Sequence, residues 1–281
     1  MPLASPLEIV PLEGPIGASV RGLDLEADWS PEVRAQLQQA WSTHHLLSVH
    51  QPGLSEEAQL AFVGLFGPLW DERPGEFLQF VSNHHDERII SEGALLFHSD
   101  LAFTPQPVLG LSLYGIEIPK SGAQTFFANA ARAWRRLGAS TQQQLRSLHA
   151  RHLFDLTTQR GDRPYRDETL PDHEPRAVHP ACLSHPRRDF ETLYVSRMQT
   201  DRIVELSREA SDTLLAELFE ALYAPDNVYE HEWREGDLLV WDNLALQHAR
   251  PPMPAHETRT LRRATLATAG VADQVGGAPR Q

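Results

Sequence analysis

The chain has 281 residues, 41% of them hydrophobic and 22% charged, so it is long enough to build one large domain around a sizeable core. Its 25 basic residues (Lys and Arg) and 38 acidic ones give a net charge of −13, which argues against nucleic acid as the main partner. Cys182 is the only cysteine, and no apolar stretch approaches the ~20 residues that span a bilayer, so disulfides, cysteine metal clusters and membrane contact are not expected.

Short strands and capped helices alternate in the first quarter of the chain. Each of two helices is preceded by a serine whose hydroxyl can accept a free backbone amide, and Pro31 follows the first serine. Between the helices, apolar and polar residues alternate as they do in strands. We expect, in chain order, a strand pair within 7–25, a helix from Ser30, a strand over 46–49 and a helix from Ser55 to Leu65.

From Leu95 onward the pattern becomes mainly β. Branched and apolar residues gather in short runs that end at Gly, Pro or Asp. Two helices interrupt the strands, one from Ser140 with Gln143 as a capping box and one over 207–223 with leucines on one face. The expected strands cover 108–118, 125–128, 177–183, 192–196, 238–242 and 259–267.

This order of elements predicts a mainly β fold with flanking helices around a double-stranded β-helix core, the jelly roll or cupin-like architecture. We expect a single domain over residues 1–270. The polar segment near 155–177 is rich in Arg, Asp and Pro and suggests a long loop that could act as a lid. Residues 271–281 are expected to form a flexible tail, and the first residues carry no signal-peptide pattern, so a cytoplasmic protein is expected.

One short motif suggests a metal site. In an extended strand, residues two apart point to the same face, so His98 and Asp100 could bind one metal ion together. They would form two-thirds of the 2-His-1-carboxylate triad of non-haem iron(II) oxygenases, and His248, beyond the buried strand 238–242, is the best third ligand. The chain has 14 histidines, so the motif alone leaves an ordinary histidine beside an acid equally open.

Several spaced motifs together resemble the TauD/TfdA family of Fe(II)/2-oxoglutarate-dependent dioxygenases. The resemblance covers about Leu7 to Ala269. The matching positions are His98-Ser99-Asp100, the turn from Ser121 to Thr125, Gly236 to Asn243, His248, Arg259 and Arg263, with Gln51 and Phe66 to Leu69 as further landmarks. The turn before Thr125 lacks the second Gly and the Asp of the family pattern.

The resemblance implies a set of roles and co-substrates. His98, Asp100 and His248 would bind Fe(II), and Thr125 and Arg259 would hold the far carboxylate of 2-oxoglutarate. A planar guanidinium suits that task because it grips a carboxylate through two charge-assisted hydrogen bonds. The family implies dioxygen as oxidant, succinate and carbon dioxide as co-products, and often a homodimer or homotetramer.

The substrate is expected to be a small molecule that carries a carboxylate or sulfonate. Arg263 lies four residues after Arg259, so on a regular strand both face the same pocket, and Arg263 would meet the substrate anion. Taurine is disfavoured because Ala94 and the segment 69–71 lack its contacting side chains. An apolar wall from Phe97, Phe103 and Trp70 would suit an aromatic or aliphatic acid.

Other readings remain open at this point. Because related halogenases carry Gly or Ala where this chain has Asp100, hydroxylation of an unactivated C–H bond is favoured, with desaturation or oxidative cleavage as alternatives at the same site. From other classes, the triad could hold zinc for hydrolysis, or the chain could be a non-catalytic jelly-roll binding protein. Arg262 is expected at the surface, and the pairs His44-His45 and His84-His85 are expected at the surface or in loops.

Overall fold

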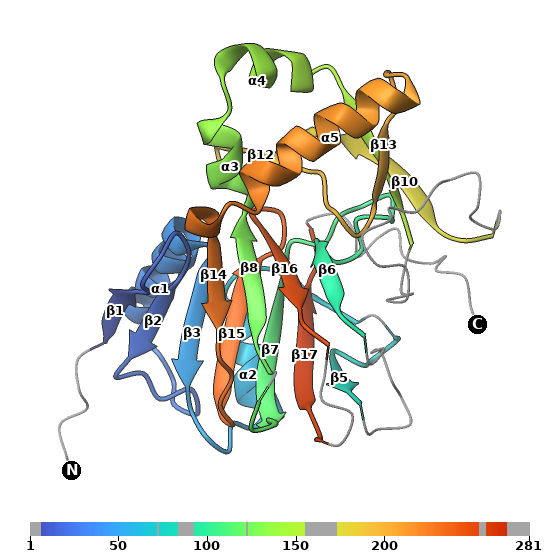
Figure 1. Ribbon diagram of the computed structural model, residues 1–281. Coiled ribbons are helices and arrows are strands. Elements are labelled where there is room, and N and C mark those ends of the chain that lie inside the picture. The colour runs from blue at the N-terminus through green and yellow to red at the C-terminus, as the bar shows by residue number, and fades with distance from the viewer. Residues whose placement is uncertain are drawn as a thin grey trace.

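The computed structural model describes residues 7–71, 73–83, 93–121, 123–154, 173–252 and 257–268. Two β-sheets face each other, and helices cover the outside of this core (Figure 1). The expected jelly-roll core is therefore present. Most of the expected lid and the whole tail, residues 155–172 and 269–281, lie outside the described residues.

The larger sheet has eight strands, and the smaller sheet that faces it has four. In spatial order the larger sheet contains β1 (Glu8–Pro11), β2 (Ala18–Arg21), β3 (Leu46–His50), β15 (Asp237–Asp242), β7 (Gly110–Glu117), β17 (Thr260–Leu266) and β4 (Leu69–Trp70), with β5 (Leu78–Ser82) also paired to β17. The smaller sheet contains β14 (Val228–His231), β8 (Thr125–Asn129), β16 (Leu246–Arg250) and β6 (Leu95–His98).

Additional strands extend one end of this core. One three-stranded sheet and one strand pair lie close to the helices at the top of the view in Figure 1. They contain β10 (Arg176–Pro180), β9 (His149–Leu153) and β13 (Thr200–Ile203), and β11 (Cys182–Ser184) with β12 (Glu191–Leu193). The single strand expected over 177–183 is therefore two strands in different sheets, with Ala181 between them donating its amide to Leu148.

Helices cover two parts of the core. Helices α1 (Pro31–His44) and α2 (Glu56–Val63) pack behind the larger sheet, and α3 (Ala130–Arg136), α4 (Ala139–Leu145) and α5 (Arg208–Leu222) lie at the end of the sheets (Figure 1). A short 3₁₀ turn, η3 (Pro225–Asn227), follows α5. No helix in the described ranges is long and apolar enough to cross a bilayer.

The helix caps confirm part of the sequence prediction and correct part of it. The hydroxyls of Ser30, Ser55 and Ser207 accept amides at the starts of α1, α2 and α5. The capping box at Ser140 was wrong, because α4 begins after Gly138 and has no side-chain cap. Helix α3 was not expected at all; the Asn129 side chain caps it.

Strand β15 shows why the larger sheet is central to the fold. All six of its residues are buried. Leu238 and Val240 pack in the cluster that includes the helices, whereas Leu239 and Trp241 pack in the cluster between the sheets. A strand covered on both faces reads as a continuous apolar run rather than an alternating one.

Candidate active site

Three potential metal ligands converge from β6, the turn after it, and β16. His98 and His248 are register partners on the antiparallel pair β6–β16, so both imidazoles lie on the same face, with ring centres 4.2 Å apart. Asp100 Oδ1 lies 3.1 Å from His98 Nε2 and 3.6 Å from His248 Nε2. The three ligand atoms lie within 4.8 Å of one another, so these side chains could hold one metal ion.

The surroundings orient two of the three ligands. His98 Nδ1 lies 2.8 Å from the Leu96 carbonyl, so it donates there and leaves Nε2 with a lone pair. Asp100 follows β6 in a turn rather than in the extended strand that the sequence suggested. Asn243 fixes this turn, because its side chain accepts the Asp100 amide at 2.9 Å and donates to the Asp100 carbonyl at 3.1 Å.

The protonation states also suit metal binding. Burial alone would raise the pKa of Asp100, but Arg263, with Nη2 3.2 Å from Oδ2, and the two imidazoles lower it well below its usual range. Burial lowers the pKa of His248 to about 3, and His98 adds to this effect. At neutral pH Asp100 is a carboxylate and His248 a neutral imidazole, the forms that donate electron pairs to a metal.

A buried arginine lies beside Thr125, at a second part of the site. Arg259 is only 2% exposed, and its Nη2 lies 3.5 Å from Thr125 Oγ1, a long contact. Burial lowers the pKa of Arg259 to about 9, with Arg250 contributing, so the guanidinium is still charged at neutral pH. No carboxylate of the described residues forms an ion pair with it, so this buried cation could accept an anionic ligand.

The residues expected to contact substrate lie in different surroundings. Arg263 lies beside the metal ligands, as its ion pair with Asp100 shows. Phe97 stacks on Tyr223 at the end of α5, with ring centres 4.4 Å apart. Phe103 packs edge-on against Phe154, and Trp70 is half-buried on β4. Contacts of Phe97, Phe103 and Trp70 with a substrate remain predictions.

Comparison with known proteins identifies the chain. The model of the "Taurine catabolism dioxygenase TauD, TfdA family" matches residues 8–265. The chain belongs to the TauD/TfdA family. It is 30% identical over 268 residues to (S)-phenoxypropionate/alpha-ketoglutarate-dioxygenase of Sphingobium herbicidovorans, covering 90% of this chain and 92% of that protein.

Two further relatives support the same conclusion. Pentalenolactone F synthase of Streptomyces arenae is 28% identical over 283 residues, covering 91% of this chain and 94% of that protein. The crystal structure of AAD-2 in complex with Mn(II) and N-oxalylglycine matches with a TM-score of 0.77 and 27% identity, over 94% of this chain and 98% of that one. This TauD/TfdA chain is therefore a 2-oxoglutarate-dependent dioxygenase of the non-haem iron type.

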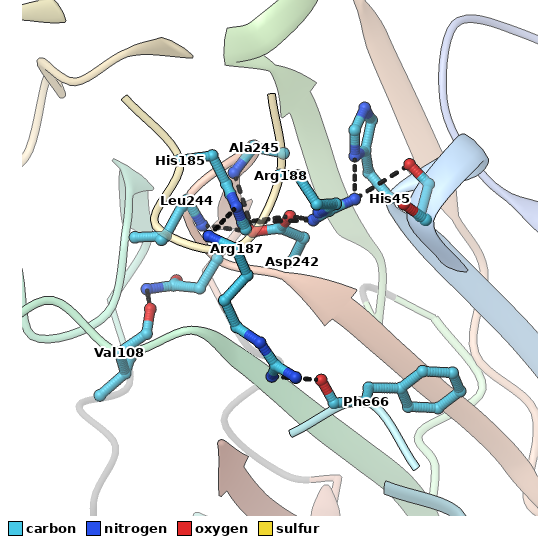
Figure 2. A network of polar contacts seen from close by, with 11 residues as sticks. His45, Phe66, Val108, His185, Arg187, Arg188, Asp242, Leu244 and Ala245 are labelled. Atoms are coloured by element: carbon cyan, nitrogen blue, oxygen red, sulfur yellow. Dashed lines mark hydrogen bonds and ion pairs between the residues drawn. The ribbon is translucent and has the colours of Figure 1, made fainter. Parts of the chain in front are cut away.

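A buried polar network holds the turn that carries the TauD/TfdA chain from β15 into β16 (Figure 2). One oxygen of Asp242 accepts the amides of Leu244 and Ala245, at 2.9 and 3.1 Å. The other oxygen faces His185 Nε2 at 3.1 Å and the guanidinium of Arg188. Because His248 follows on β16, this network fixes the start of the strand that presents it.

Arg188 extends the network to α1 and corrects one prediction. It donates to the Ser42 carbonyl at 2.9 Å and lies 3.2 Å from His45 Nδ1 (Figure 2). Of the two places expected for His45, the loop is right and the surface is wrong: it lies in the bend between α1 and β3, with a φ of 62°, and is buried. His44 is half-buried, and His84-His85 lies outside the described residues.

The prediction for Arg262 was also wrong. This side chain is buried, and it donates to Gln59 Oε1 and the Leu54 carbonyl, each at 2.7 Å, because α2 covers the outer face of β17. Conversely, the sequence did not reveal Trp233 and Arg250, which are both buried. Trp233 donates to Thr125, and Arg250 lies near enough to Arg259 for its charge to affect the pKa of Arg259. The alternation of β16 could have identified Arg250, since it lies two residues after His248.

Proposed function

We propose that this dioxygenase hydroxylates an unactivated C–H bond of a small carboxylic or sulfonic acid. 2-Oxoglutarate and dioxygen would be the co-substrates, with succinate and carbon dioxide as co-products. The observation that supports the proposal best is the pairing of two features in one site. His98, Asp100 and His248 form a compact donor set, and the buried cation Arg259 lies beside Thr125.

The donor set fits iron(II). Two imidazoles and one carboxylate match the ligands of the facial triad, which leaves coordination positions open for other molecules. His98, Asp100 and His248 would hold the ion, and iron(II) supplies the activation of dioxygen in such sites. Arg259 would bind and orient the far carboxylate of 2-oxoglutarate, and Thr125 would donate to the same group.

The substrate class is inferred from Arg263 and from a relative. Arg263 is 8% exposed and lies beside Asp100, so its guanidinium would bind the acidic group of a substrate close to the metal. A relative that is 30% identical is named for phenoxypropionate, which is a carboxylate. Aromatic side chains of Phe97, Phe103 and Trp70 would favour an aromatic or aliphatic acid over taurine.

Some alternatives and expectations remain beside this proposal. Desaturation and oxidative cleavage use the same ligands, so they are the alternative outcomes at this site. Membership of the dioxygenase family disfavours both zinc-dependent hydrolysis and a non-catalytic role. A single domain over 1–270, a lid near 155–177 and a homodimer or homotetramer remain predictions.

The decisive experiment is an anaerobic visible spectrum of the protein with iron(II) and 2-oxoglutarate. We expect a metal-to-ligand charge-transfer band, which should shift when an acid that is a substrate enters the site. His98→Ala should lose the band, and wild-type protein with the matching acid should consume oxygen and form succinate in step with product. Failure of the wild-type protein to give the band would refute the proposal.

A further inference from the structure

We propose that Arg250 is a second arginine for 2-oxoglutarate, and that it grips the far carboxylate together with Arg259. This inference rests on the proposed function, because it concerns the same co-substrate. It assigns a role to a buried side chain that the family motifs do not include.

The register of the smaller sheet places Arg250 next to Thr125. On β16 and β8 the paired residues follow an unbroken antiparallel register: Leu246 with Asn129, Gln247 with Ala128, His248 with Phe127, and Ala249 with Phe126. Continued by one residue, this register would set Arg250 opposite Thr125; on its other side, β16 pairs with β6, and that register shifts between His248 and Arg250. Directly opposite residues of an antiparallel pair project from the same face, with Cβ atoms about 5 Å apart.

The alternation of side chains along β16 shows on which face of the sheet Arg250 lies. Residues two apart on a strand share a face, so Arg250 projects on the side of His248. The His248 ring lies 4.2 Å from the ring of His98, so this side is the one that carries the metal ligands. Arg250 is accordingly buried, at 5% exposure. One of its donors bonds the Pro251 carbonyl at 3.0 Å.

The residues on β16 and β17 follow the same spatial order, from the metal ligands to Thr125. On β17, Arg263 contacts Asp100, and Arg259, just before the first strand residue, contacts Thr125. On β16, His248 is at the metal end, and Arg250 lies two residues further, about 6.7 Å along a strand. That separation is comparable to the reach of a five-carbon dicarboxylate from its 2-oxo end to its far carboxylate.

The charges of Arg250 and Arg259 explain why an anion would bind between them. Both side chains are charged at neutral pH, because a guanidinium stays protonated in proteins. Arg250 is near enough to Arg259 for its charge to lower the pKa of Arg259. Two neighbouring buried cations repel each other, and a carboxylate with two oxygens can accept from both guanidiniums. Arg263 lies at the metal end instead, where a substrate anion would bind.

The first test measures 2-oxoglutarate binding without turnover. Protein loaded with Mn(II) is titrated with 2-oxoglutarate by calorimetry, for wild type, Arg250→Gln and Arg250→Lys. We expect Arg250→Gln to raise the Kd about 10- to 100-fold, because it removes a charge-assisted contact, and Arg250→Lys to raise it less. An unchanged Kd in Arg250→Gln would overturn the inference.

Truncating the ligand shows which group Arg250 contacts. 2-Oxopentanoate has a methyl group in place of the far carboxylate, so wild type and Arg250→Gln should bind it equally weakly. If Arg250→Gln weakened both ligands by the same factor, Arg250 would act on the metal end or on folding, and the inference would be wrong. A changed KM for the acid substrate with an unchanged Kd for 2-oxoglutarate would also overturn it.

Two further variants guard against a folding artefact. Arg262→Gln removes a buried arginine on the opposite face of β17 and should leave the Kd for 2-oxoglutarate unchanged. Arg259→Gln should still prefer 2-oxoglutarate to 2-oxopentanoate, because Arg250 remains; complete loss of that preference would overturn the inference without any change at Arg250. Failure of wild-type protein to bind 2-oxoglutarate would instead refute the proposed function.

Discussion

The hydroxyl of Thr125 has two donors directed at its oxygen. Trp233 Nε1 donates to Oγ1 at 2.9 Å, and Arg259 Nη2 approaches it at 3.5 Å. A hydroxyl oxygen has two lone pairs and one hydrogen, so the hydrogen of Thr125 is left to donate. Trp233 therefore orients the hydroxyl toward an acceptor, which in the proposed function is the far carboxylate of 2-oxoglutarate.

Replacing this indole should weaken the co-substrate contact. Trp233→Phe removes the donor and keeps an aromatic ring, so we expect the Kd for 2-oxoglutarate to rise about fivefold, as for loss of one neutral hydrogen bond. Calorimetry on the Mn(II) protein measures it. Trp29→Phe is the matched control, because Trp29 Nε1 donates to the Asp24 carbonyl at an exposed position. An equal effect of both substitutions would contradict the orienting role.

Residue by residue, strand spacing explains what the sequence could predict. His98 and Asp100 are two residues apart, and Arg259 and Arg263 are four apart, so each pair was expected on one side. His98 and Asp100 do meet, with His98 Nε2 3.1 Å from Asp100 Oδ1. Arg263 contacts Asp100, and Arg259 contacts Thr125. Alternation also turns Arg262 away from Arg263, but it cannot tell whether solvent or α2 covers that face.

Among the elements, the turn between β15 and β16 has two separable supports. One oxygen of Asp242 accepts the amides of Leu244 and Ala245, which shapes the turn itself. The other oxygen pairs with Arg188 and His185, which ties the turn to the segment after β11. An asparagine at this position could still accept the backbone amides of Leu244 and Ala245. It would lose the ion pairs with Arg188 and His185.

Asp242→Asn should therefore cost stability more than metal affinity. It leaves the guanidinium of Arg188, whose side chain is 14% exposed, without its carboxylate, so we expect a loss of about 3 kcal/mol in the free energy of unfolding. Asp242→Ala also removes the oxygen that accepts the amides of Leu244 and Ala245. We therefore expect the Kd for Mn(II) of Asp242→Ala to be about tenfold higher than that of Asp242→Asn. Urea unfolding and metal titration measure the two effects.

The matched control for this pair is a surface carboxylate. Asp226→Asn breaks ion pairs with Arg132 and Arg136, but its side chain is 57% exposed. The loss of these ion pairs should lower the free energy of unfolding by less than about 1 kcal/mol. If Asp242→Asn were as mild as Asp226→Asn, the buried pair would not stabilise the turn. If Asp242→Ala bound Mn(II) like wild type, the turn would not control the position of His248.

Elements were predictable where local signals were strong. Serine caps located α1 and α2, leucines on one face located α5, and apolar runs located β7 and β15. Helix α3 has seven residues and begins directly after β8, so it offered too few turns for a helical period to be recognised. Helix α4 shows the limit of motif reading, because the chain enters it at Gly138 before the serine of the apparent capping box is reached.

Across the whole molecule, several histidines are buried in neutral form. Burial lowers the pKa of His45 and of His152 to about 3, with Arg188 and His179 respectively adding to the effect. In the unfolded chain these imidazoles take up protons below about pH 6.5. The unfolded state therefore binds more protons as the pH falls from 6.5 toward 3, so acid lowers the free energy of unfolding.

His152 provides the clearest test of this acid sensitivity. It is 1% exposed, its Nε2 has no hydrogen-bond partner among the described residues, and its Nδ1 lies 3.3 Å from Thr200 Oγ1. A phenyl ring therefore loses one hydrogen bond, a cost of about 1 kcal/mol that does not change between pH 7 and pH 5. Each histidine of this kind contributes about 1.4 kcal/mol per pH unit below its unfolded pKa. Between pH 7 and pH 5, the free energy of unfolding should therefore fall by about 2 kcal/mol less for His152→Phe than for wild type.

Urea unfolding of the metal-free protein at several pH values between 7 and 5 measures this difference, with chelator present so that metal binding to His248 does not enter. The expected result is a shallower slope of unfolding free energy against pH for His152→Phe. His173→Gln is the control, because a side chain that is 74% exposed is solvated in both states. Equal slopes for wild type and His152→Phe would mean that His152 takes up its proton in the folded protein, and burial would then not explain the acid sensitivity.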